Sequence, residues 1–447
     1  MARAAYRPDF LFSGGRVHAG ATLTVRDGIV EAIGAAPADL RPQELRGRAL
    51  LPGMVAAHSH AFQRAIRGRT EHRTTGRDDF WTWREAMYRA AERLDPDDLY
   101  AISKFCFLEM ARAGITAVGE FHYLHRDAEG KPYANPNELD LSVARAAREA
   151  GLRLRLLRVA YARSGFGIPE NPRQKRFIES SSDEYLENLH ALAKQVEVGA
   201  APHSVRACPK EWIKDIAAEA KRAGWVLHLH VSEQPGEVEQ CKAEHGTTPG
   251  MLLQELGAVH ERMTAVHGVH LTDEEIALFG RARATVCACP TTERNLGDGI
   301  VRAGALFAAS VDVCFGTDSE VQLSPLEDAR QLEYHLRLAE MRRAILDAPA
   351  GPGGVGAKLY GCASASGMRS LGFAGGTLSE GEPADFVEVD LDDPSIAGAS
   401  AEDLMADVVF SMERTALRAT YVAGSKLELD FAGALPGFKA AMRRLWG

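Results

Sequence analysis

Histidines and one acid end several short apolar runs of this sequence. They are His58 and His60 after LPGMVAA, His230 in WVLHLH, His267 in TAVH, and Asp318 in VCFGTD. Imidazole nitrogens and a carboxylate, with no thiolate among them, suit Zn²⁺ or Fe²⁺ and leave a coordination position open for water. Residues i and i+2 of a strand face the same side, so His58 and His60 can point at one ion. The pattern therefore predicts a metal centre that activates water.

A second histidine pair leaves one ligand position to be decided. His228 and His230 also share a face, and Glu233 follows three residues after His230, where it would face the same cavity. We therefore predict that His230 binds the metal and that His228 has a structural role or supports a metal ligand from behind. Glu233 is then the candidate proton shuttle between the attacking water and the leaving group.

Two further roles follow from placement at strand ends. Asp318 can bind the metal and also accept a proton from the water, whereas His267 can orient the water or polarise the substrate. No lysine ends the fourth expected strand, in VEVGAAPHS, where a carbamylated side chain could bridge two ions. A single metal ion per chain is therefore expected.

The elements that must position these residues alternate between helix and strand. Asp95 and Pro96 begin a helix that ends near Gly114, and the strand ITAVGEF follows. The same unit recurs along the chain, and with LPGMVAAHSH it yields eight strands, of which the fourth is weak. Eight such units predict a closed (β/α)₈ barrel of the α/β class, whose carboxyl strand ends converge on one catalytic face.

Both ends of the chain lack this helical pattern. The N-terminal segment contains short strands between glycine-rich turns, and alternating Val, Phe and Tyr in residues 376–394 and 408–429 predict further strands. We expect residues 1–50 and 373–447 to form a small β-sandwich domain, with a terminal helix, beside a barrel of residues 51–372.

Several loops of the expected barrel carry cationic and hydrogen-bonding side chains. They are Gln63 after HSH, Arg84 in FWTWRE, Tyr123 in FHY, and His203 and Arg206 in PHSVR. An arginine fork binds a carboxylate through two parallel hydrogen bonds, and Tyr, Gln and His add single ones. A small anionic substrate is therefore expected.

The composition excludes several classes of protein. The 447 residues are 46% hydrophobic and 25% charged, which is typical of a globular chain. The formal net charge of −9 does not favour nucleic acid, and no run of 18 apolar residues or signal-peptide pattern predicts membrane insertion or export. The seven cysteines form no CxxC pair, so no disulfide framework or thiolate zinc site is expected. We expect a cytoplasmic enzyme without a membrane or nucleic-acid partner.

Ten segments of the sequence carry a resemblance to a known family. LPGMVAAHSH, HLHVSEQ, TAVHG, CFGTDS and GTLSEGEPADFVEVD resemble the amidohydrolase superfamily over nearly the whole chain, and HxH with a later HxxE is similar to its mononuclear deaminase branch. More narrowly, HSHAFQRA, FWTWREAMY, GEFHYLHRD, PHSVRA and CPTTERNLGDGI are similar to the N-formimino-L-glutamate deiminases of histidine degradation.

This resemblance implies a role for each matching residue. The implied ligands of one Zn²⁺, with Fe²⁺ as the alternative, are His58, His60, His230 and Asp318. The implied catalytic residues are Glu233, His267 and Asp318. The residues implied to hold the two substrate carboxylates are Gln63, Arg84, Tyr123, His203 and Arg206. The implied reaction is hydrolysis of the formimino C=N bond, with Glu233 protonating the nitrogen and ammonia leaving. A homodimer is expected by analogy with related enzymes.

Two positions depart from the deiminase pattern. Glu320 in GTDSEV stands where His is usual, and Arg294 in TTERN stands where a small residue is usual, so both are expected to change the charge near the cavity. The alternatives are a related deaminase of another formimino or amidino acid or of a nucleobase, and an inactive barrel scaffold. The arginine-rich loops count against a nucleobase, and the complete set of expected ligands counts against a scaffold.

Overall fold

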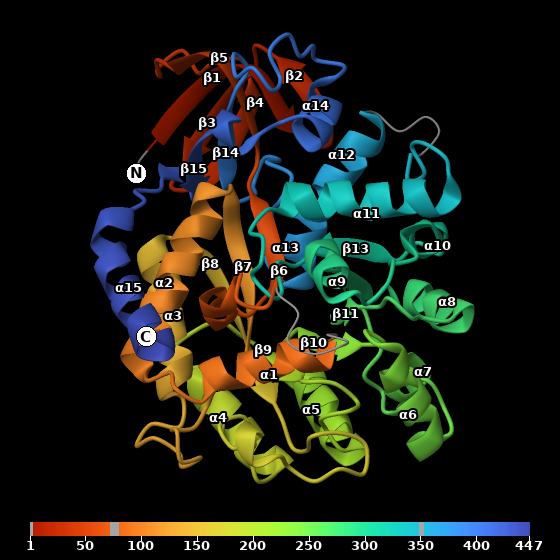
Figure 1. Cartoon of the computed structure of the whole chain (residues 1–447). Coiled ribbons are helices and arrows are strands. Elements are labelled where there is room, and N and C mark those ends of the chain that lie inside the picture. Colours follow the sequence, from red (N-terminus) through yellow and green to blue (C-terminus); the bar gives the residue numbers. More distant parts are fainter. Residues whose placement is uncertain (1–2, 72–79, 348–352) are drawn as a thin grey trace.

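Eight parallel strands form the barrel that the alternating pattern predicts. The structure is a computed structural model that describes residues 3–71, 80–347 and 353–447. The barrel strands pair in chain order and lie at the centre of the molecule in Figure 1. They are β6 (Met54–Ser59), β7 (Ile115–His122), β8 (Arg153–Ala160), β9 (Val198–Pro202), β10 (Leu227–Val231), β11 (Met263–His267), β12 (Thr285–Ala288) and β13 (Asp312–Phe315).

The barrel closes where the chain returns beside its first strand. Thr317 and Asp318, directly after β13, donate backbone hydrogen bonds of 2.9 and 3.2 Å to the carbonyl of His58 in β6. The amide of His60 donates back to the Asp318 carbonyl at 3.3 Å. The first and last segments of the barrel are therefore joined at residues predicted to bind the metal.

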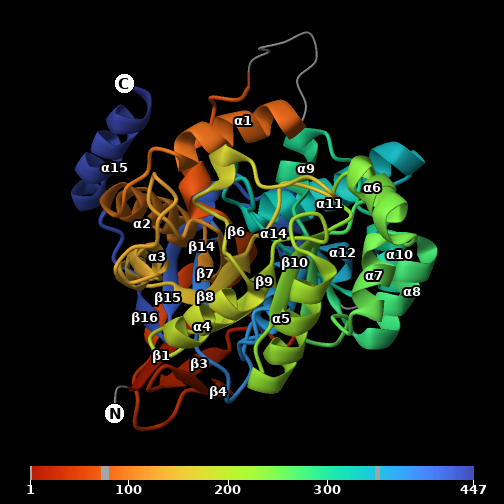
Figure 2. The same ribbon diagram turned by 90° about the horizontal axis from the view of Figure 1, so that it is seen from below.

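Helices surround the barrel strands, as Figure 2 shows from below. The first long one begins as predicted, because the Asp95 carboxylate accepts a 2.7 Å hydrogen bond from the amide of Asp98. Within the described ranges, no helix combines the length and apolar character needed to cross a membrane. The helices up to Ser370 are η1 (Ala61–Ile66), α1 (Phe80–Ala91), α2 (Pro96–Arg112), α3 (Glu138–Ala150), η2 (Pro172–Gln174), α4 (Ser182–Leu192), α5 (Lys210–Ala223), α6 (Pro235–His245), α7 (Pro249–Glu255), α8 (Asp273–Ala282), α9 (Pro290–Leu296), α10 (Ala303–Ala308), α11 (Pro325–Glu340), α12 (Gly354–Gly361), η3 (Cys362–Ser366) and α13 (Gly367–Ser370).

Both ends of the chain contribute to a second eight-stranded sheet, which forms the small β-sandwich domain. The C-terminal half pairs with the N-terminal half in antiparallel register, with Phe386 opposite Pro52. Tyr6, Phe386 and Tyr421 pack together in its core, so this core needs both ends of the chain. The strands are β1 (Arg3–Ser13), β2 (Arg16–Ala19), β3 (Thr22–Arg26), β4 (Ile29–Gly34), β5 (Gln43–Pro52), β14 (Phe386–Asp390), β15 (Leu417–Val422) and β16 (Ser425–Lys426).

The sandwich packs against the amino ends of the first barrel strands. Gly53 separates β5 from β6, and its amide donates to the carbonyl of Asp385 at 2.9 Å. The Asp385 carboxylate accepts hydrogen bonds of 2.5 and 3.0 Å from Arg153 at the start of β8. The carboxyl ends of these strands, with their polar residues, therefore lie at the opposite end of the barrel.

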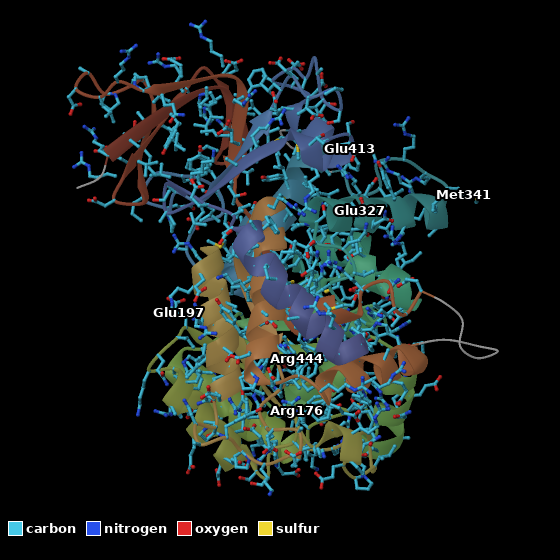
Figure 3. All side chains as sticks on the ribbon, turned by 60° about the vertical axis from the view of Figure 1, so that its left-hand side comes forward. Arg176, Glu197, Glu327, Met341, Glu413 and Arg444 are labelled. Carbon is cyan, nitrogen blue, oxygen red and sulfur yellow. The ribbon has the colours of Figure 1, made fainter. Side chains whose placement is uncertain are left out.

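The C-terminal helix α15 (Phe431–Trp446) lies along the outside of the barrel, next to α2, as Figure 3 shows from the side. Arg444 near its end forms an ion pair with Asp98 of α2. The indole of Trp446 donates to the carbonyl of Ala65 in η1, at 3.1 Å. The end of the chain thus supports the segment that follows the HSH motif.

One segment predicted as a strand is a helix. The alternation in residues 408–429 predicts strands, but residues 408–410 belong to α14 (Leu404–Phe410). The buried residues Met405, Val408 and Val409 are spaced as on one face of a helix, and this helical period outweighs the β-propensity of valine. Strand β15 follows only after η4 (Arg414–Ala416).

A buried ion-pair network ties η1 to the helical layer. Glu109 of α2 accepts two hydrogen bonds from Arg64, at 2.8 and 3.0 Å, and one from Arg67 at 2.8 Å. Arg64 also donates to the carbonyl of Glu320, in the loop after β13, at 2.6 Å. The side chains of Arg64 and Glu109 are only 12% and 9% exposed. The network therefore joins η1, α2 and the loop that closes the barrel.

We expect Glu109→Ala to lower the free energy of unfolding by about 3 kcal/mol, because removal of one partner leaves buried guanidinium charge uncompensated. Urea denaturation measures this change. The matched control is Glu149→Ala, which removes a partner of Lys104 from a pair whose carboxylate is 38% exposed. That variant should lose less than about 1 kcal/mol. Equal losses in the two variants would contradict a supporting role for the network.

Candidate metal-dependent active site

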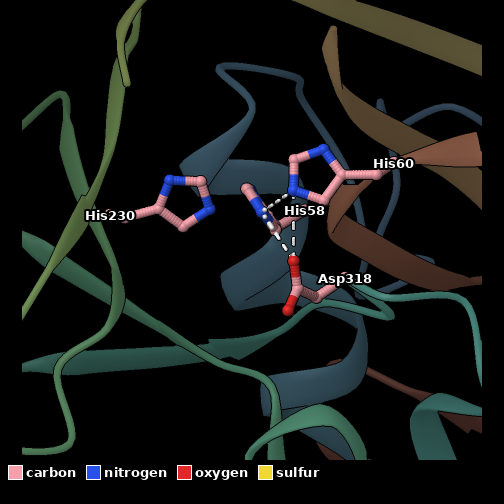
Figure 4. A group of neighbouring side chains, drawn as sticks. All are labelled: His58, His60, His230 and Asp318. Atoms are coloured by element: carbon pink, nitrogen blue, oxygen red, sulfur yellow. Dashed lines mark hydrogen bonds and ion pairs between the residues drawn. The ribbon is translucent and has the colours of Figure 1, made fainter. Parts of the chain in front are cut away.

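Four of the predicted residues meet at the carboxyl ends of the barrel strands, as Figure 4 shows. They are His58, His60, His230 and Asp318, and one ligand atom of each lies within 4.8 Å of the others. The Nε2 atoms of His58 and His60 are 3.2 Å apart, and each lies 3.2 Å from Oδ1 of Asp318. Nitrogen and oxygen donors that converge in this way in a buried position form a cation site.

Backbone carbonyls fix the rings of two of these histidines. Nδ1 of His60 donates to the carbonyl of Phe121 at 2.8 Å, and Nδ1 of His230 donates to that of His203 at 3.0 Å. A proton on Nδ1 leaves Nε2 free to bind a metal. Burial lowers the pKa of His58 to about 3 and that of His230 well below its usual value, so both rings are neutral. Three imidazoles and a carboxylate fit a divalent transition metal with an open position.

Glu233 and His267 face this group from neighbouring strands. Nε2 of His267 lies 3.7 Å from Oε1 of Glu233 and 3.9 Å from Oδ2 of Asp318. These separations allow a water molecule or a substrate atom to bridge the groups. Burial raises the pKa of Glu233, with the charge of His267 opposing and that of Asp318 reinforcing the effect. A carboxyl group with a raised pKa can take up and release a proton near neutral pH.

Two site residues have a strained backbone. His267 and Asp318 have φ angles of 70° and 46°, in the left-handed region that favours glycine. Such a conformation costs about 1–3 kcal/mol per residue and persists where the surrounding structure enforces it. Here the backbone hydrogen bonds that close the barrel hold Asp318. The strain turns both side chains toward the metal group at the point where each strand ends.

Two acids beside His267 are not found by strand-end reasoning. Glu293, in the first turn of α9, accepts hydrogen bonds from Nδ1 of His267 at 3.4 Å and from the amide of Cys289 at 2.8 Å. Burial opposes charge on His267, but Glu233 and Glu293 raise its pKa well above the usual value. Burial and the charge of Glu233 raise the pKa of the neighbouring Asp298 to about 9. Both acids lie in the segment CPTTERNLGDGI, several residues after the end of β12. The only signal for them in the sequence is that this segment contains acidic residues.

The residues predicted to hold substrate line one pocket over the metal group. The pocket encloses about 530 Å³ of space, which includes its open mouth. Oε1 of Gln63 is buried and has no donor within the described ranges, and Nη1 of Arg206 likewise has no acceptor there. The wall of this pocket includes all five residues predicted to hold the substrate, namely Gln63, Arg84, Tyr123, His203 and Arg206. The wall also includes Glu233, His267 and Asp318.

Six further wall residues lie outside the predicted set. The signal available in the sequence for the first three was helical spacing, because residues three and four apart share a face of α1. The remaining three come from separate later segments. These wall residues are Trp83, Met87 and Tyr88 of α1, and Tyr161, Phe177 and Leu296 from later segments, with Arg84 completing the α1 face.

Three residues considered in the sequence lie outside the pocket wall. His228 points away from the metal group and donates from Nε2 to the carbonyl of Ser370 at 2.9 Å. Glu320 is buried beneath the site, where burial and the charge of Glu120 raise its pKa well above the usual value. Arg294 donates to Gln322 at 2.8 Å and is 42% exposed. Neither Glu320 nor Arg294 therefore changes the charge of the wall itself.

We expect His230→Gln to weaken divalent metal binding by more than about 100-fold, because loss of residues that only orient a ligand already costs about 10- to 100-fold. The measurement is a chelator competition on the purified protein. His228→Gln, two residues away on the same strand, is the matched control and should bind the metal within about threefold of the wild type. The reverse order of effects would assign the ligand to His228.

A family model and several known proteins match most of this chain. The model described as the amidohydrolase family matches residues 49–427. The formimidoylglutamate deiminase of Pseudomonas aeruginosa is 40% identical over 402 residues, which cover 87% of each chain. The 5-methylthioadenosine/S-adenosylhomocysteine deaminase of Moorella thermoacetica is 30% identical over 367 residues, covering 81% of this chain and 77% of that protein.

Solved structures agree with this assignment. A crystal structure of an amidohydrolase from Brucella melitensis has a TM-score of 0.88 and 31% identity, and the match covers 99% of this chain and 100% of that one. An adenosine deaminase from Xanthomonas campestris, solved with bound zinc, has a TM-score of 0.82 at 22% identity over 99% and 98% of the two chains, which shows a shared fold. The family model matches residues 49–427, and the Pseudomonas aeruginosa deiminase is 40% identical over 87% of this chain. These two findings establish that this chain belongs to the amidohydrolase family.

Proposed function

We propose that this protein is a zinc-dependent deiminase that hydrolyses N-formimino-L-glutamate to N-formyl-L-glutamate and ammonia, a reaction of histidine degradation. One observation carries the proposal: a single pocket joins the histidine and aspartate group, the Glu233 and His267 pair, and the guanidinium groups of Arg84 and Arg206. The similarity to the Pseudomonas aeruginosa deiminase supports the same substrate.

The proposed metal has a site at the carboxyl ends of the barrel strands. His58, His60, His230 and Asp318 would hold it, and this set of nitrogen and oxygen donors suits zinc, with Fe²⁺ as the alternative. When bound, the metal supplies Lewis acidity that lowers the pKa of water and so provides a nucleophile near neutral pH. The metal content of the purified protein distinguishes the two ions.

The proton transfers are assigned to Glu233 and His267. Glu233, whose pKa burial raises, accepts a proton from the attacking water and delivers it to the formimino nitrogen. The same carboxylate then passes the proton of the added hydroxyl to this nitrogen as the C–N bond breaks, so that ammonia leaves and the formyl C=O forms. His267 orients the water, because its Nε2 faces Glu233 and Asp318 while its Nδ1 is held by Glu293. Asp318 can share the proton through Oδ2, since Oδ1 faces the two histidines.

The remaining wall residues are assigned to the two substrate carboxylates. Arg206 and Arg84 supply the positive charge, and the open Nη1 of Arg206 is a donor without an acceptor in the described ranges. Gln63 donates to the Tyr123 hydroxyl at 2.8 Å, so the phenol proton remains to be donated to a carboxylate, whereas Oε1 of Gln63 remains to accept from an N–H of the substrate. His203 completes this part of the wall, where burial and the charge of Arg206 keep its pKa low and the ring neutral.

The decisive experiment is ammonia release by the zinc-loaded protein. N-formimino-L-glutamate should be turned over, and N-formimino-L-aspartate, one methylene shorter, should have a kcat/KM lower by about 10- to 100-fold. 5-Methylthioadenosine and guanine serve as nucleobase-containing comparisons and should release no ammonia, because a neutral base leaves the guanidinium groups unpaired. Glu233→Gln should retain zinc and lose at least about 100-fold in kcat. Preferential turnover of a nucleobase compound would overturn the proposal.

Glu293 allows the role of His267 to be tested separately. In Glu293→Ala the imidazole loses the acceptor that fixes its orientation, so kcat should fall by about 100-fold while zinc content stays at one per chain. Asp328→Ala is the matched control, since Asp328 accepts from the amide of Thr291 in the same helix, at 3.0 Å, without touching His267. An equal loss of kcat in both variants would mean that Glu293 acts only by supporting α9.

A further inference from the structure

A buried glutamine connects two tyrosines of the pocket wall. Gln174, at the end of η2, is fully buried. Its Nε2 donates hydrogen bonds to the hydroxyls of Tyr88 and Tyr161, at 2.7 and 2.8 Å. Its Oε1 accepts a hydrogen bond from the hydroxyl of Ser164. Both amide protons and the carbonyl are therefore engaged, and these partners set the orientation of the amide.

This arrangement leaves two hydroxyl protons for a ligand. A phenol has one proton to donate and lone pairs that accept. Tyr88 and Tyr161 each accept from Gln174, and in the described parts of the chain neither hydroxyl donates to a protein acceptor. Burial and the neighbouring Tyr161 raise the pKa of Tyr88 well above its usual value, so this hydroxyl keeps its proton. Both tyrosines line the pocket, where the protons can be donated.

The two hydroxyls share this region with the cationic groups. Tyr88 follows Arg84 by one turn of α1, and the guanidinium carbon of Arg84 lies 5.5 Å from the centre of the Tyr88 ring. Arg84 and Arg206 line the same pocket as the two hydroxyls, and their positive charges oppose the rise that burial causes in the pKa of Tyr88. The Tyr161 ring lies 4.6 Å from that of His203. A group that accepts from two hydroxyls and two guanidiniums at once is an anion with several oxygens.

We propose that Tyr88 and Tyr161 bind a substrate carboxylate between Arg84 and Arg206, and that Gln174 is the positioning residue that directs both hydroxyl protons toward it. This inference rests on the proposed function, since it assumes a substrate with a carboxylate at this end of the pocket. It adds two binding residues, Tyr88 in α1 and Tyr161 after β8, and one positioning residue, Gln174 in η2, to the residues already assigned to the carboxylates.

A second amide and phenol pair near the metal group shows the same polarity. Gln63 donates through Nε2 to the Tyr123 hydroxyl at 2.8 Å. Tyr123 is buried and lines the same pocket. In both places an amide N–H occupies the phenol oxygen as acceptor, so the phenol proton remains to be donated. A wall of this kind favours carboxylate oxygens over groups that must themselves donate.

The substitution Gln174→Glu tests the polarity directly, because it keeps the shape and replaces the donor with an acceptor. The two hydroxyls would then donate to position 174 and turn their protons from the pocket. We expect the KM for N-formimino-L-glutamate to rise by at least about 30-fold, with kcat at saturation within about threefold. Tyr88→Phe and Tyr161→Phe should each raise KM by about tenfold, and neither should add to the effect of Gln174→Glu.

Two controls separate polarity from folding and from general charge. Gln174→Met removes the donor without supplying an acceptor, so the hydroxyls can still donate to substrate and KM should rise by less than about fivefold. Gln195→Glu makes the same chemical change on an exposed residue and should leave both constants unchanged. An unchanged KM in Gln174→Glu, with zinc bound and the circular dichroism of the wild type, would show that the hydroxyls already donate toward position 174 and would overturn the inference.

A binding measurement separates this inference from the proposed reaction. Calorimetry of the zinc-loaded protein with N-formyl-L-glutamate measures affinity for a dicarboxylate without chemistry, and Gln174→Glu should weaken it by at least about 30-fold. If the wild type fails to release ammonia but this loss of affinity is seen, the proposed reaction is wrong and the carboxylate site stands. If ammonia is released normally and the affinity is unchanged in Gln174→Glu, the reaction stands and the inference is wrong.

Discussion

The geometry of the metal group depends on the hydrogen bonds that close the barrel. The His58 carbonyl accepts from the amides of Thr317 and Asp318, so the same residues provide both the closure and the ligands. The 3.2 Å separation of Nε2 of His58 from Oδ1 of Asp318 therefore follows from this backbone pairing. Glu320 reinforces this arrangement, because its Oε1 accepts from the amide of His60 at 3.1 Å and from the hydroxyl of Thr317 at 3.0 Å. Glu320, one of the two residues that depart from the deiminase pattern, thus holds the backbone beneath the site.

The pocket separates two kinds of charge. Acidic groups, Glu233, Glu293 and Asp298, gather around His267, whereas the guanidinium groups of Arg84 and Arg206 lie with the tyrosines of α1 and the loop after β8. A formimino group is basic and carries positive charge when protonated, whereas a carboxylate carries negative charge. The division of charge in the pocket therefore favours one orientation of an N-formimino amino acid. Electrostatic complementarity of this kind orients a ligand more than it strengthens binding. Burial raises the pKa of Glu233, whereas burial of Asp318 is outweighed by its hydrogen bonds with His58 and His60, which lower its pKa.

The sequence predicted those parts of the molecule that follow a regular period. Eight alternating units predicted the barrel, and the i, i+2 rule placed His58 and His60 together. Of the second histidine pair, His230 faces the cavity, whereas His228 donates to the carbonyl of Ser370. Glu293 and Gln174 could not be found in this way. Each acts through contacts between distant segments, and Gln174 reaches Tyr88 across 86 positions of sequence. The helix at Leu404–Phe410 was missed for a related reason, since valines suit either element and only burial decides.

The position of the chain ends has a consequence for the order of folding. The barrel strands leave the ribosome before β14, β15 and α15, yet the sandwich core needs Phe386 and Tyr421, and η1 is supported by Trp446. During synthesis the HSH segment therefore has no final support until the last helix is released. Contacts of such long sequence separation form slowly. Without α15, Phe105 of α2 would lose its stacked partner Phe438, and the HSH segment would lose the support of Trp446.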